Sequence, residues 1–366
     1  MAFSNPAKAK HANIAGRSAI ILIAAAVAVA GGALIGLKHI ADPGAAPAEA
    51  APLPVAMPLP ATVEFGAHVG AGCDGRAAIP AFEALAGRKL QRTVDAIDQR
   101  DWKSMRSSAG WLSHCWSDAP INLTISVPMI PNGTQSTLAQ GAKGVYDDVF
   151  REIATTLVKD RLAHATLRIG WEFNGDWMPW SAAKDPTSYI AFFRRIVGIV
   201  RAVPGQYFTI EWTPGVGRHA IAPDRAYPGD DVVDLIGMDV YNEFWDRSYT
   251  DTHMRFGWLR DQPYGMAWLR DFAAAHRKPT AYSEWGSGTR PDGHGGGDDP
   301  YFITQMAIWF AATRPAYQSY WEVNDPGHYD DTLASGHHPR AAAAFKAAFA
   351  APSTSSRQAN GAGKPL

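Results

Sequence analysis

The sequence has few cysteines, almost no net charge and no internal repeat. Two cysteines occur in 366 residues, and 34 Lys+Arg against 35 Asp+Glu leave a formal net charge of −1. Such a balance argues against a nucleic-acid partner, which would favour a basic surface that displaces phosphate counterions. Charged residues make up 19%, below the usual quarter, whereas 46% are hydrophobic and 13 are tryptophan. This composition excludes a disordered or coiled-coil chain and predicts a large hydrophobic core. It also provides enough aromatic residues to line a binding cleft.

One uncharged run of twenty residues, 18–37, follows Lys8, Lys10 and Arg17. A helix of that length spans about 30 Å, the thickness of a membrane's hydrocarbon core, whereas a cleavable signal has a shorter apolar centre. We therefore expect a cytoplasmic basic N-terminus (1–17) and a transmembrane signal-anchor (18–37). The alternative is a signal peptide cut near residues 48–50. Both predict export, either anchored in the inner membrane and facing the periplasm or secreted.

The flanks of the remaining chain differ from its body in composition. Residues 38–61 are rich in Ala and Pro and read as a linker, and residues 351–366 as a disordered tail. The two cysteines, Cys73 and Cys115, are candidates for one disulfide, because their number is even and the predicted compartment is oxidising.

The body, residues 62–350, alternates short apolar runs with amphipathic segments. Strands are expected at 63–69, 121–128, 165–170, 207–213, 233–241, 279–284 and 318–322, with an eighth near 91–97 that could also be helical. Helices are expected at segments such as 145–159, 189–203, 266–276 and 301–313. Asp185-Pro186 and Asp299-Pro300 are typical helix starts, in which an acid caps the helix and proline occupies the first turn.

Repeated strand–helix alternation predicts parallel strands joined by crossover helices. Eight such units suit a closed (β/α)₈ TIM barrel, with an open doubly wound sheet as the runner-up. Residues 70–73 (GAGC) lack the third glycine of a nucleotide-binding fingerprint, so we set the open sheet aside. In a barrel, chemistry collects where strands end at the C-terminal face.

The most informative strand end is the segment 168–180, RIGWEFNGDWMPW. Here an apolar strand runs into Glu172, which three tryptophans flank: Trp171, Trp177 and Trp180. Glycosidic hydrolysis uses two carboxyl groups, and sugars stack their C–H faces on aromatic rings. The alternative is a tryptophan-rich corner of the core with Glu172 paired to Arg168. A second carboxylate, Glu284, ends the strand in residues 280–286 (TAYSEWG), before a glycine-rich loop.

Other polar strand ends are weaker candidates. Glu211-Trp212 and Trp321-Glu322 also pair a carboxylate with an aromatic; we expect both acids to be supporting groups and Trp212 to line a subsite. The loop 286–299 reads as a flexible rim or lid; its acids lack a calcium-loop pattern, so no metal is expected.

Both glutamate segments resemble the signatures of glycoside hydrolase family 26, best known for endo-β-1,4-mannanases. The resemblance extends over the body, including residues 65–70 (FGAHVG), 127–129 (VPM), 227–230 (YPGD) and 234–241 (DLIGMDVY). It implies a (β/α)₈ retaining enzyme without cofactor, with Glu172 as acid/base after the fourth strand and Glu284 as nucleophile after the seventh. It further implies that Arg168 and Tyr241 hold the nucleophile and that Trp177 lines the subsite of the reacting sugar. Trp321 is at the position where a sugar-stacking platform is expected. Further expected substrate contacts are Trp171, Asn174, Trp180, Trp212 and Trp285.

Trp171 departs from the family's mannanases, which usually have histidine before the acid. An indole offers one N–H donor and a stacking face, so the sugar specificity stays open. We expect an exported retaining endo-β-glycosidase acting on a β-linked polysaccharide, first of all β-1,4-mannan. The alternatives are an endo-acting hydrolase or transglycosylase of another β-glycan or of a self-made exopolysaccharide, and a non-catalytic carbohydrate-binding barrel. The expected partners are the polysaccharide and, through the N-terminal helix, the membrane; no nucleic acid is expected.

Overall fold

A computed structural model describes residues 59–351 of the chain. The predicted N-terminus (1–17), membrane segment (18–37), most of the linker (38–61) and nearly all of the tail (351–366) lie outside these residues. Within 59–351, no helix is both long and apolar enough to cross a membrane.

Eight parallel strand positions close into a barrel. The strands follow one another in the order β6-β5-β4-β3-β2-β1-β9-β8-β7, and β6 also pairs with β8, which closes the cylinder. Because β6 and β7 both pair with β8, they are two pieces of a single sixth strand, broken at residues 238–239. The barrel strands are β1 (Glu64–His68), β2 (Arg92–Ala96), β3 (Asn122–Val127), β4 (Thr166–Ile169), β5 (Thr209–Trp212), β6 (Leu235–Gly237), β7 (Val240–Tyr241), β8 (Thr280–Gly286) and β9 (Tyr317–Trp321).

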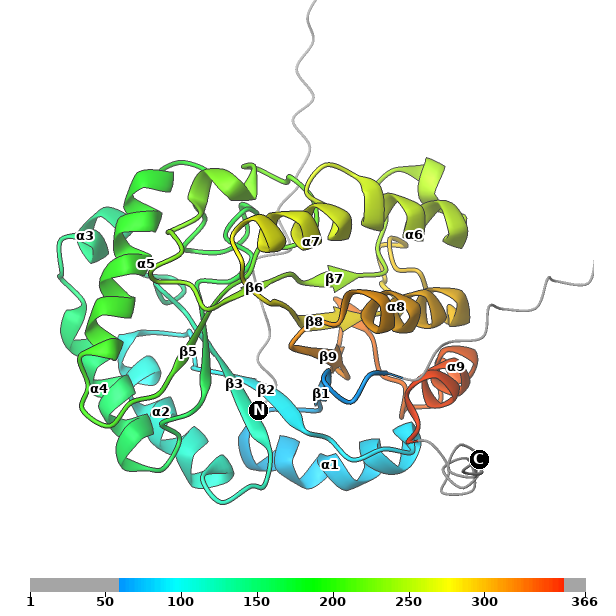
Figure 1. The fold of residues 1–366 in the computed structure, drawn as a ribbon, viewed down its shortest axis with the longest axis horizontal. Coiled ribbons are helices and arrows are strands. Elements are labelled where there is room, and N and C mark those ends of the chain that lie inside the picture. Colours follow the sequence, from blue (N-terminus) through cyan, green and yellow to red (C-terminus); the bar gives the residue numbers. More distant parts are fainter. Residues whose placement is uncertain (1–58, 352–366) are drawn as a thin grey trace, which may run out of the picture.

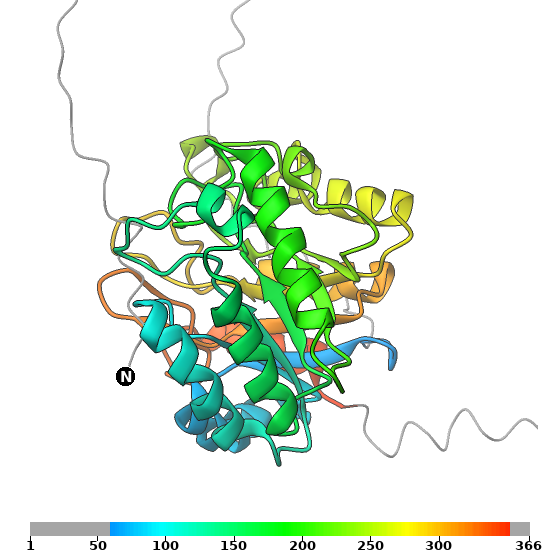
Figure 2. The same ribbon diagram turned by 90° about the vertical axis from the view of Figure 1, so that its left-hand side faces the viewer.

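Helices form an outer layer around these strands (Figure 1). In the view turned by 90°, α4 and α5 lie side by side on one flank (Figure 2), in agreement with their direct packing. The α-helices are α1 (Gly72–Ala86), α2 (Trp102–Trp116), α3 (Leu138–Ala142), α4 (Asp147–Lys159), α5 (Pro186–Arg201), α6 (Thr252–Asp261), α7 (Met266–Ala275), α8 (Pro300–Thr313) and α9 (Pro339–Phe349). Short 3₁₀ helices are η2 (Pro223–Ala226) and η3 (Arg247–Tyr249), and β10 (Asn324–Asp325) pairs with β11 (Tyr329–Asp330) as a small hairpin after β9.

The predicted barrel is therefore confirmed, including the segment near 91–97, which is strand β2 and not a helix. Both predicted helix starts are found as well. The Asp185 carboxylate accepts from the backbone N–H of Ser188 at the start of α5, and that of Asp299 accepts from Tyr301 and Phe302 at the start of α8. In each case proline occupies the first turn, where its missing N–H costs nothing.

The barrel interior is polar from the N-terminal ends of the strands to the middle of the barrel. Alternate residues of each strand point inward, so the layers are built from residues two apart. Near the N-terminal ends of the strands, Arg92 donates to Glu64, Thr124 and Thr166. In the layer above, the fully buried Glu211 accepts hydrogen bonds from Thr213, Ser283 and Tyr317. Gly237 leaves room for this carboxylate, because a Cβ there would lie 2.5 Å from Glu211 Oε1.

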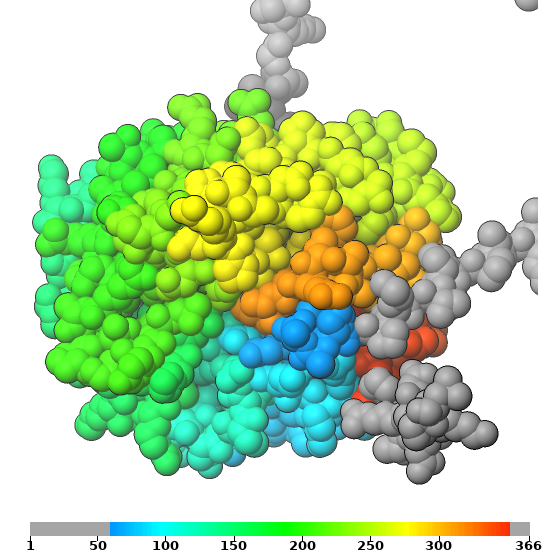
Figure 3. All heavy atoms as spheres, in the orientation of Figure 1, coloured from blue at the N-terminus to red at the C-terminus, as the bar shows by residue number. Residues whose placement is uncertain are grey.

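The barrel closes between its first and last strands. β1 pairs with β9 over its whole length, from Glu64 with Tyr317 to His68 with Trp321. In the space-filling view, the first described residues (blue) are wedged between the cyan and orange segments that flank them (Figure 3). Helix α9 covers this seam, where Phe345 and Phe349 pack on Phe65.

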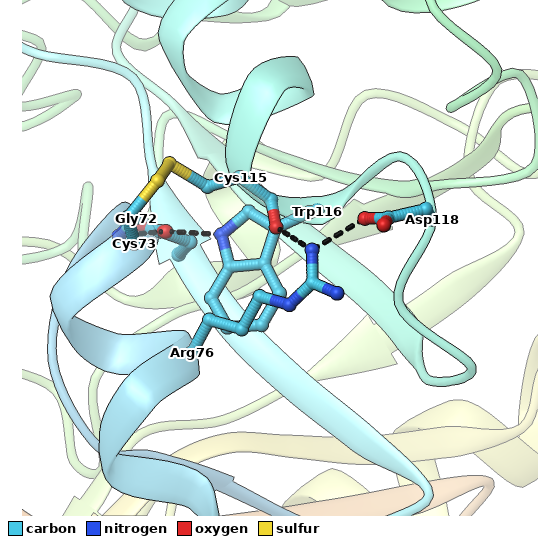
Figure 4. Close-up of a disulfide and its surroundings, with 7 residues drawn as sticks. Gly72, Cys73, Arg76, Cys115, Trp116 and Asp118 are labelled. Carbon is cyan, nitrogen blue, oxygen red and sulfur yellow. Dashed lines mark hydrogen bonds and ion pairs between the residues drawn. A yellow bond between two sulfur atoms is a disulfide. The ribbon is translucent and has the colours of Figure 1, made fainter.

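Cys73 and Cys115 form a disulfide that joins α1 to α2 (Figure 4). The surrounding bonds reinforce the same junction. Arg76 donates to the carbonyl of Cys115 and pairs with Asp118, while the Asp95 carboxylate accepts from Trp116 and from the backbone of Gly72. The disulfide and these bonds together fix the two helices against the end of β2.

Candidate active site

Glu284 lies within β8 near its C-terminal end, and both of its carboxylate oxygens are held. Oε1 accepts from Arg168 Nη1 on β4 at 2.5 Å, and Oε2 accepts from the hydroxyl of Tyr241 on β7 at 2.6 Å. Burial, with the charge of Glu284 adding to it, raises the pKa of Tyr241 well above its ordinary value. The hydroxyl therefore keeps its proton and stays a donor. Three strands thus fix the orientation of one carboxylate that is 8% exposed.

Arg168 also binds Asp239 deeper in the barrel. Its Nη1 donates to Ser126 at 3.0 Å as well as to Glu284, and its Nη2 donates to Asp239. Burial alone would lower the pKa of Arg168, but the charges of Asp239 and Glu284 outweigh burial and raise it. Arg168 is thus a fixed positive charge between two carboxylates.

Asp239 occupies the break between β6 and β7. At this break its backbone pairs with Gly215, and its side chain meets Arg168. Burial raises the pKa of Asp239; Arg168 opposes the rise, and the charges of Glu284 and Glu172 add to it. The sixth strand is thus interrupted at Asp239, the residue whose side chain binds Arg168 inside the barrel.

Glu172 follows β4 on a strained backbone. Its φ of 50° lies in the left-handed region, which L-residues with a side chain rarely adopt. The backbone N–H donates to the carbonyl of Thr213 at 2.8 Å, and the carboxylate Oε2 accepts from Trp177 Nε1 at 2.8 Å. Gly175 allows Trp177 this position, because a Cβ at residue 175 would lie 2.4 Å from the ring. The turn therefore presents Glu172 beside an indole, with 8% of the residue exposed.

The predicted aromatic residues divide into two groups. Trp177 and Trp321 are partly exposed, as a substrate contact requires. Trp321 stacks on His68, with ring centroids 4.1 Å apart, and donates to the hydroxyl of Tyr329 at 3.0 Å. His68 and Tyr329 were not among the sequence candidates, because nothing in the local pattern places them beside Trp321.

Four predicted substrate contacts are corrected, because the structure buries them completely. Trp180 donates to the carbonyl of Trp171; Asn174 bridges to Gly215 and Gly217. Trp212 packs among Phe173, Tyr227 and Phe272, and Trp285 donates to Gln318 and packs on Phe310, Tyr320, Phe345 and Phe349. These residues support the site from behind and present no surface to a sugar.

Trp171 is nearly buried as well. Its ring lies 5.3 Å from the Arg168 guanidinium and 4.6 Å from the ring of Trp180. At the position where the family's mannanases usually carry histidine, this chain therefore has an indole packed against the arginine that holds Glu284.

The two weaker acid candidates, Glu211 and Glu322, make contacts that stabilise the fold. Glu211 is saturated by three hydroxyl donors inside the barrel. Glu322 accepts from the backbone N–H groups of Leu333 and Ala334, and burial raises its pKa to about 7. The hydrogen-bond partners of both carboxylates are groups of the protein that hold strands and loops together.

The loop 286–299, expected to be a flexible rim or lid, is tied down by its charged residues. Arg290 pairs with Glu243, Asp298 with Arg340 and Asp299 with Arg255. Over residues 59–351, His, Cys, Asp and Glu side chains form no group of three or more that could hold a metal ion. The loop is better described as a braced rim of the site.

Comparison with known families supports the resemblance seen in the motifs. The model of glycosyl hydrolase family 26 matches residues 139–257, a range that includes Glu172, Arg168 and Tyr241 and ends before Glu284. The resemblance to this family that the motifs predicted is therefore confirmed.

Two curated relatives match the chain over part of their length. Endoglucanase H of Acetivibrio thermocellus is 26% identical over 317 residues, which cover 80% of this chain and 31% of that protein. Mannan endo-1,4-beta-mannosidase of Bifidobacterium adolescentis is 30% identical over 202 residues, which cover 51% of this chain and 20% of that protein. The chain thus spans about a third or less of these relatives.

Solved structures share the fold. The catalytic domain of a Bacillus family 26 endo-beta-1,4-mannanase has a TM-score of 0.55 at 17% identity, covering 79% of this chain and 87% of that chain. A Cellulomonas fimi endo-beta-1,4-mannanase double mutant has a TM-score of 0.55 at 19% identity, covering 78% and 74%. At such identities the likeness shows the common barrel.

Proposed function

We propose that this chain, with its resemblance to glycosyl hydrolase family 26, is a retaining endo-β-glycosidase. The polysaccharide that we propose first as its substrate is β-1,4-mannan. The observation that carries the proposal is the double anchoring of Glu284 by Arg168 and Tyr241. A carboxylate with both oxygens fixed is oriented for in-line attack, because little freedom has to be lost when the substrate arrives. The mannanase among the curated relatives supports the choice of polymer.

In the proposed first step, a carboxylate oxygen of Glu284 attacks the anomeric carbon and the glycosidic bond breaks. Glu172 gives its proton to the departing oxygen, and the sugar stays covalently bound to Glu284. In the second step, a water molecule gives a proton to Glu172. The oxygen of this water attacks the anomeric carbon, and the bond from the sugar to Glu284 breaks. The anomeric configuration is inverted twice and so retained.

The indole of Trp177 has a defined part in this scheme. It donates to Glu172 Oε2 from a ring that is itself partly exposed. The same residue can therefore orient the acid and contact the sugar beside it. Trp321, braced from behind by His68, offers a second apolar face near the nucleophile.

A reducing-end release assay tests the proposal on a panel of mannan, β-glucan, β-xylan and the host's exopolysaccharide. The wild-type protein should cleave one neutral β-linked polymer, and Glu284→Gln should reduce turnover by at least about 1,000-fold. Glu83→Gln, which changes a carboxylate on the outer helix α1, serves as the control and should retain full activity. Release that survives in Glu284→Gln would disprove the role of this residue.

The anomeric configuration of the first product distinguishes a retaining mechanism from an inverting one. Proton NMR of a fresh digest should show the β-anomer before it equilibrates, as retention demands. An α-anomer formed first would contradict a glycosyl-enzyme on Glu284, and products longer than the substrate would indicate a transglycosylase. Binding of a polymer without release would favour a non-catalytic barrel.

β-Glucan is the second candidate polymer. Endoglucanase H matches more of this chain than the mannosidase does. Trp171 also replaces the histidine usual in the family's mannanases, so the group beside the acid can donate a hydrogen bond but cannot accept one. Greater release from β-glucan than from mannan in the same panel would establish this specificity.

We also propose that the protein is exported. The disulfide between Cys73 and Cys115 supports an oxidising compartment, because such bonds are rare where thiols are kept reduced. The residues predicted to anchor the chain, 18–37, lie outside those described. Protease added to spheroplasts should degrade the protein; protection until the inner membrane is opened would refute export.

A further inference from the structure

Trp245 is the most exposed tryptophan of the described residues, with 65% of its surface in solvent. It follows β7 at the C-terminal face of the barrel, the face that carries Glu284. Its ring stacks on His294 at a centroid distance of 4.3 Å. A single exposed ring needs no explanation by itself, so its neighbours decide whether Trp245 belongs to a binding surface.

The ring of Trp245 is held by two loops that are bonded to each other. The backbone N–H of Phe244 donates to the carbonyl of His294 at 3.0 Å, and His294 Nδ1 contacts the carbonyl of Phe244 at 2.8 Å. Glu243 also forms a bridge with Gly295. The aromatic platform is therefore preorganised, which reduces the entropy lost when a ligand binds.

Arg290 connects the platform to a cavity. Its guanidinium lies 5.3 Å from the ring centroid of Trp245 and is 6% exposed, since Glu243 and Asp292 bind it. Arg290 also lines a shallow surface cavity of about 290 Å³, open to solvent, between the loop 289–291 and the β10–β11 hairpin. That volume is at the lower limit for small-molecule sites and suits one sugar unit.

The cavity adjoins the proposed catalytic centre through Tyr329. This residue lines the cavity, and its hydroxyl accepts from Trp321 Nε1. Burial raises the pKa of Tyr329, and the charge of Glu284 contributes to the rise, which places the phenol within electrostatic reach of the nucleophile. Trp321, Tyr329, the cavity and Trp245 therefore follow one another along the rim.

The charges around the cavity discriminate between kinds of sugar. One guanidinium, Arg290, pairs with Glu243 and Asp292, and the cavity that Arg290 lines carries two further acids, Asp325 and Asp330. His328 and His337 lie against two of these carboxylates and offset them only when protonated. An acidic sugar would add negative charge here, whereas the hydroxyls of a neutral sugar can donate to these carboxylates.

We infer that this cavity and Trp245 form a distal subsite for a neutral sugar unit of the polysaccharide chain whose reacting unit lies between Glu172 and Glu284. The inference rests on the proposed function for its ligand class. Binding can nevertheless be measured without turnover, so the two can fail separately.

The test compares Glu284→Gln with the double variant Glu284→Gln/Trp245→Ala in native gels containing mannan or β-glucan. Removal of the indole should weaken retardation about three- to ten-fold in apparent affinity. Affinity for a disaccharide, measured by calorimetry, should stay unchanged, while that for a hexasaccharide should fall. Asn324→Ala, on the cavity lining, should also weaken binding of the hexasaccharide.

Tyr207→Ala is the matched control. Tyr207 is 66% exposed and stacks on His164, but it precedes β5 and so lies at the opposite end of the barrel. In the Glu284→Gln background its removal should leave retardation unchanged.

Equal retardation with and without Trp245, or no retardation by any neutral polymer, would overturn the inference. Stronger retardation by a polyuronate would overturn the assignment to a neutral sugar. A wild-type protein that cleaves nothing, yet loses binding in Trp245→Ala, would refute the proposed function and leave the subsite standing.

Discussion

At the residue scale, the candidate nucleophile depends on donors from two other strands. Arg168 supplies charge as well as a hydrogen bond, and its loss would also leave Asp239 buried without its cation. Tyr241 supplies an uncharged hydroxyl donor to Glu284. The contribution of orientation is therefore best isolated at Tyr241.

Tyr241→Phe should lower kcat/KM by about 10- to 100-fold, because one anchor of Glu284 is lost while the ring remains. Stability should change by about 1 kcal/mol or less. Tyr282→Phe is the control: its hydroxyl accepts from Trp309 on the outer side of β8, so activity should be unaffected. Steady-state kinetics and urea denaturation measure both. Equal losses of activity in the two variants would contradict a specific role for Tyr241.

Glu322 should make stability pH-dependent. Burial raises the pKa of its carboxyl from the ordinary 4.5 to about 7, so between these values the folded state binds more protons than the unfolded state. Stability is then fully present below about pH 4.5 and is lost as pH rises towards about 7, by up to about 3 kcal/mol. Urea denaturation across this range should show the fall in wild type but not in Glu322→Gln. Parallel curves would show that Glu322 titrates normally.

Apolar strands that run into a carboxylate were sufficient to predict Glu172 and Glu284 as candidates, whereas Arg168 and Tyr241 were predicted from the resemblance to glycoside hydrolase family 26. The partners of Trp321 could not be predicted, since His68 and Tyr329 reach it from another strand and from a hairpin. The four buried residues were misjudged for a related reason. The segment 171–180 curls back so that Trp180 donates to Trp171, and local polarity does not reveal such a turn.

At the element scale, strands were more predictable than helices. Seven of the eight strand positions were predicted from short apolar runs, whereas the eighth, near 91–97, could also have been helical; the parallel pairing follows from the alternation with helices. Helix α1 contains Pro80 and two buried glycines, and α2 is rich in serine, so neither has a strong helical composition. Tertiary packing and the Asp101 cap stabilise α2 where propensity is weak.

The disulfide between α1 and α2 closes a loop with a sequence separation of 42. The double variant Cys73→Ser/Cys115→Ser should therefore lose about 3–4 kcal/mol of unfolding free energy, because its unfolded chain is less constrained. Guanidinium denaturation of the wild type with and without reductant is the matched measurement. The reduced wild type should coincide with the double variant; no difference between oxidised and reduced protein would contradict the prediction.

At the scale of the whole molecule, one aromatic cluster ties the barrel seam to the site. Phe345 on α9 packs on Phe65 of β1, Phe82 of α1, Trp285 of β8 and Tyr320 of β9. Trp285 is the residue after Glu284. The helix that covers the seam therefore also backs the proposed nucleophile.

Phe345→Ala should lower the free energy of unfolding by about 3–5 kcal/mol, because the truncated side chain would leave an internal cavity where α9 packs on β1, α1, β8 and β9. Tryptophan fluorescence and circular dichroism should report one coincident transition, since the closed barrel has no independent half. Ala342→Gly, on the same helix but only partly buried, is the control and should cost about 1 kcal/mol. Two separate transitions would refute a single cooperative unit.

The pairing of β1 with β9 also determines when the protein can first act. Every residue proposed for catalysis, from Arg168 to Glu284, is synthesised before β9 and α9. Until then β1 lacks one neighbour and Trp285 lacks the rings of Tyr320 and Phe345 behind it. Activity consequently arises in one late step of biosynthesis, and a chain kept unfolded during passage through a membrane carries its catalytic groups without a working site.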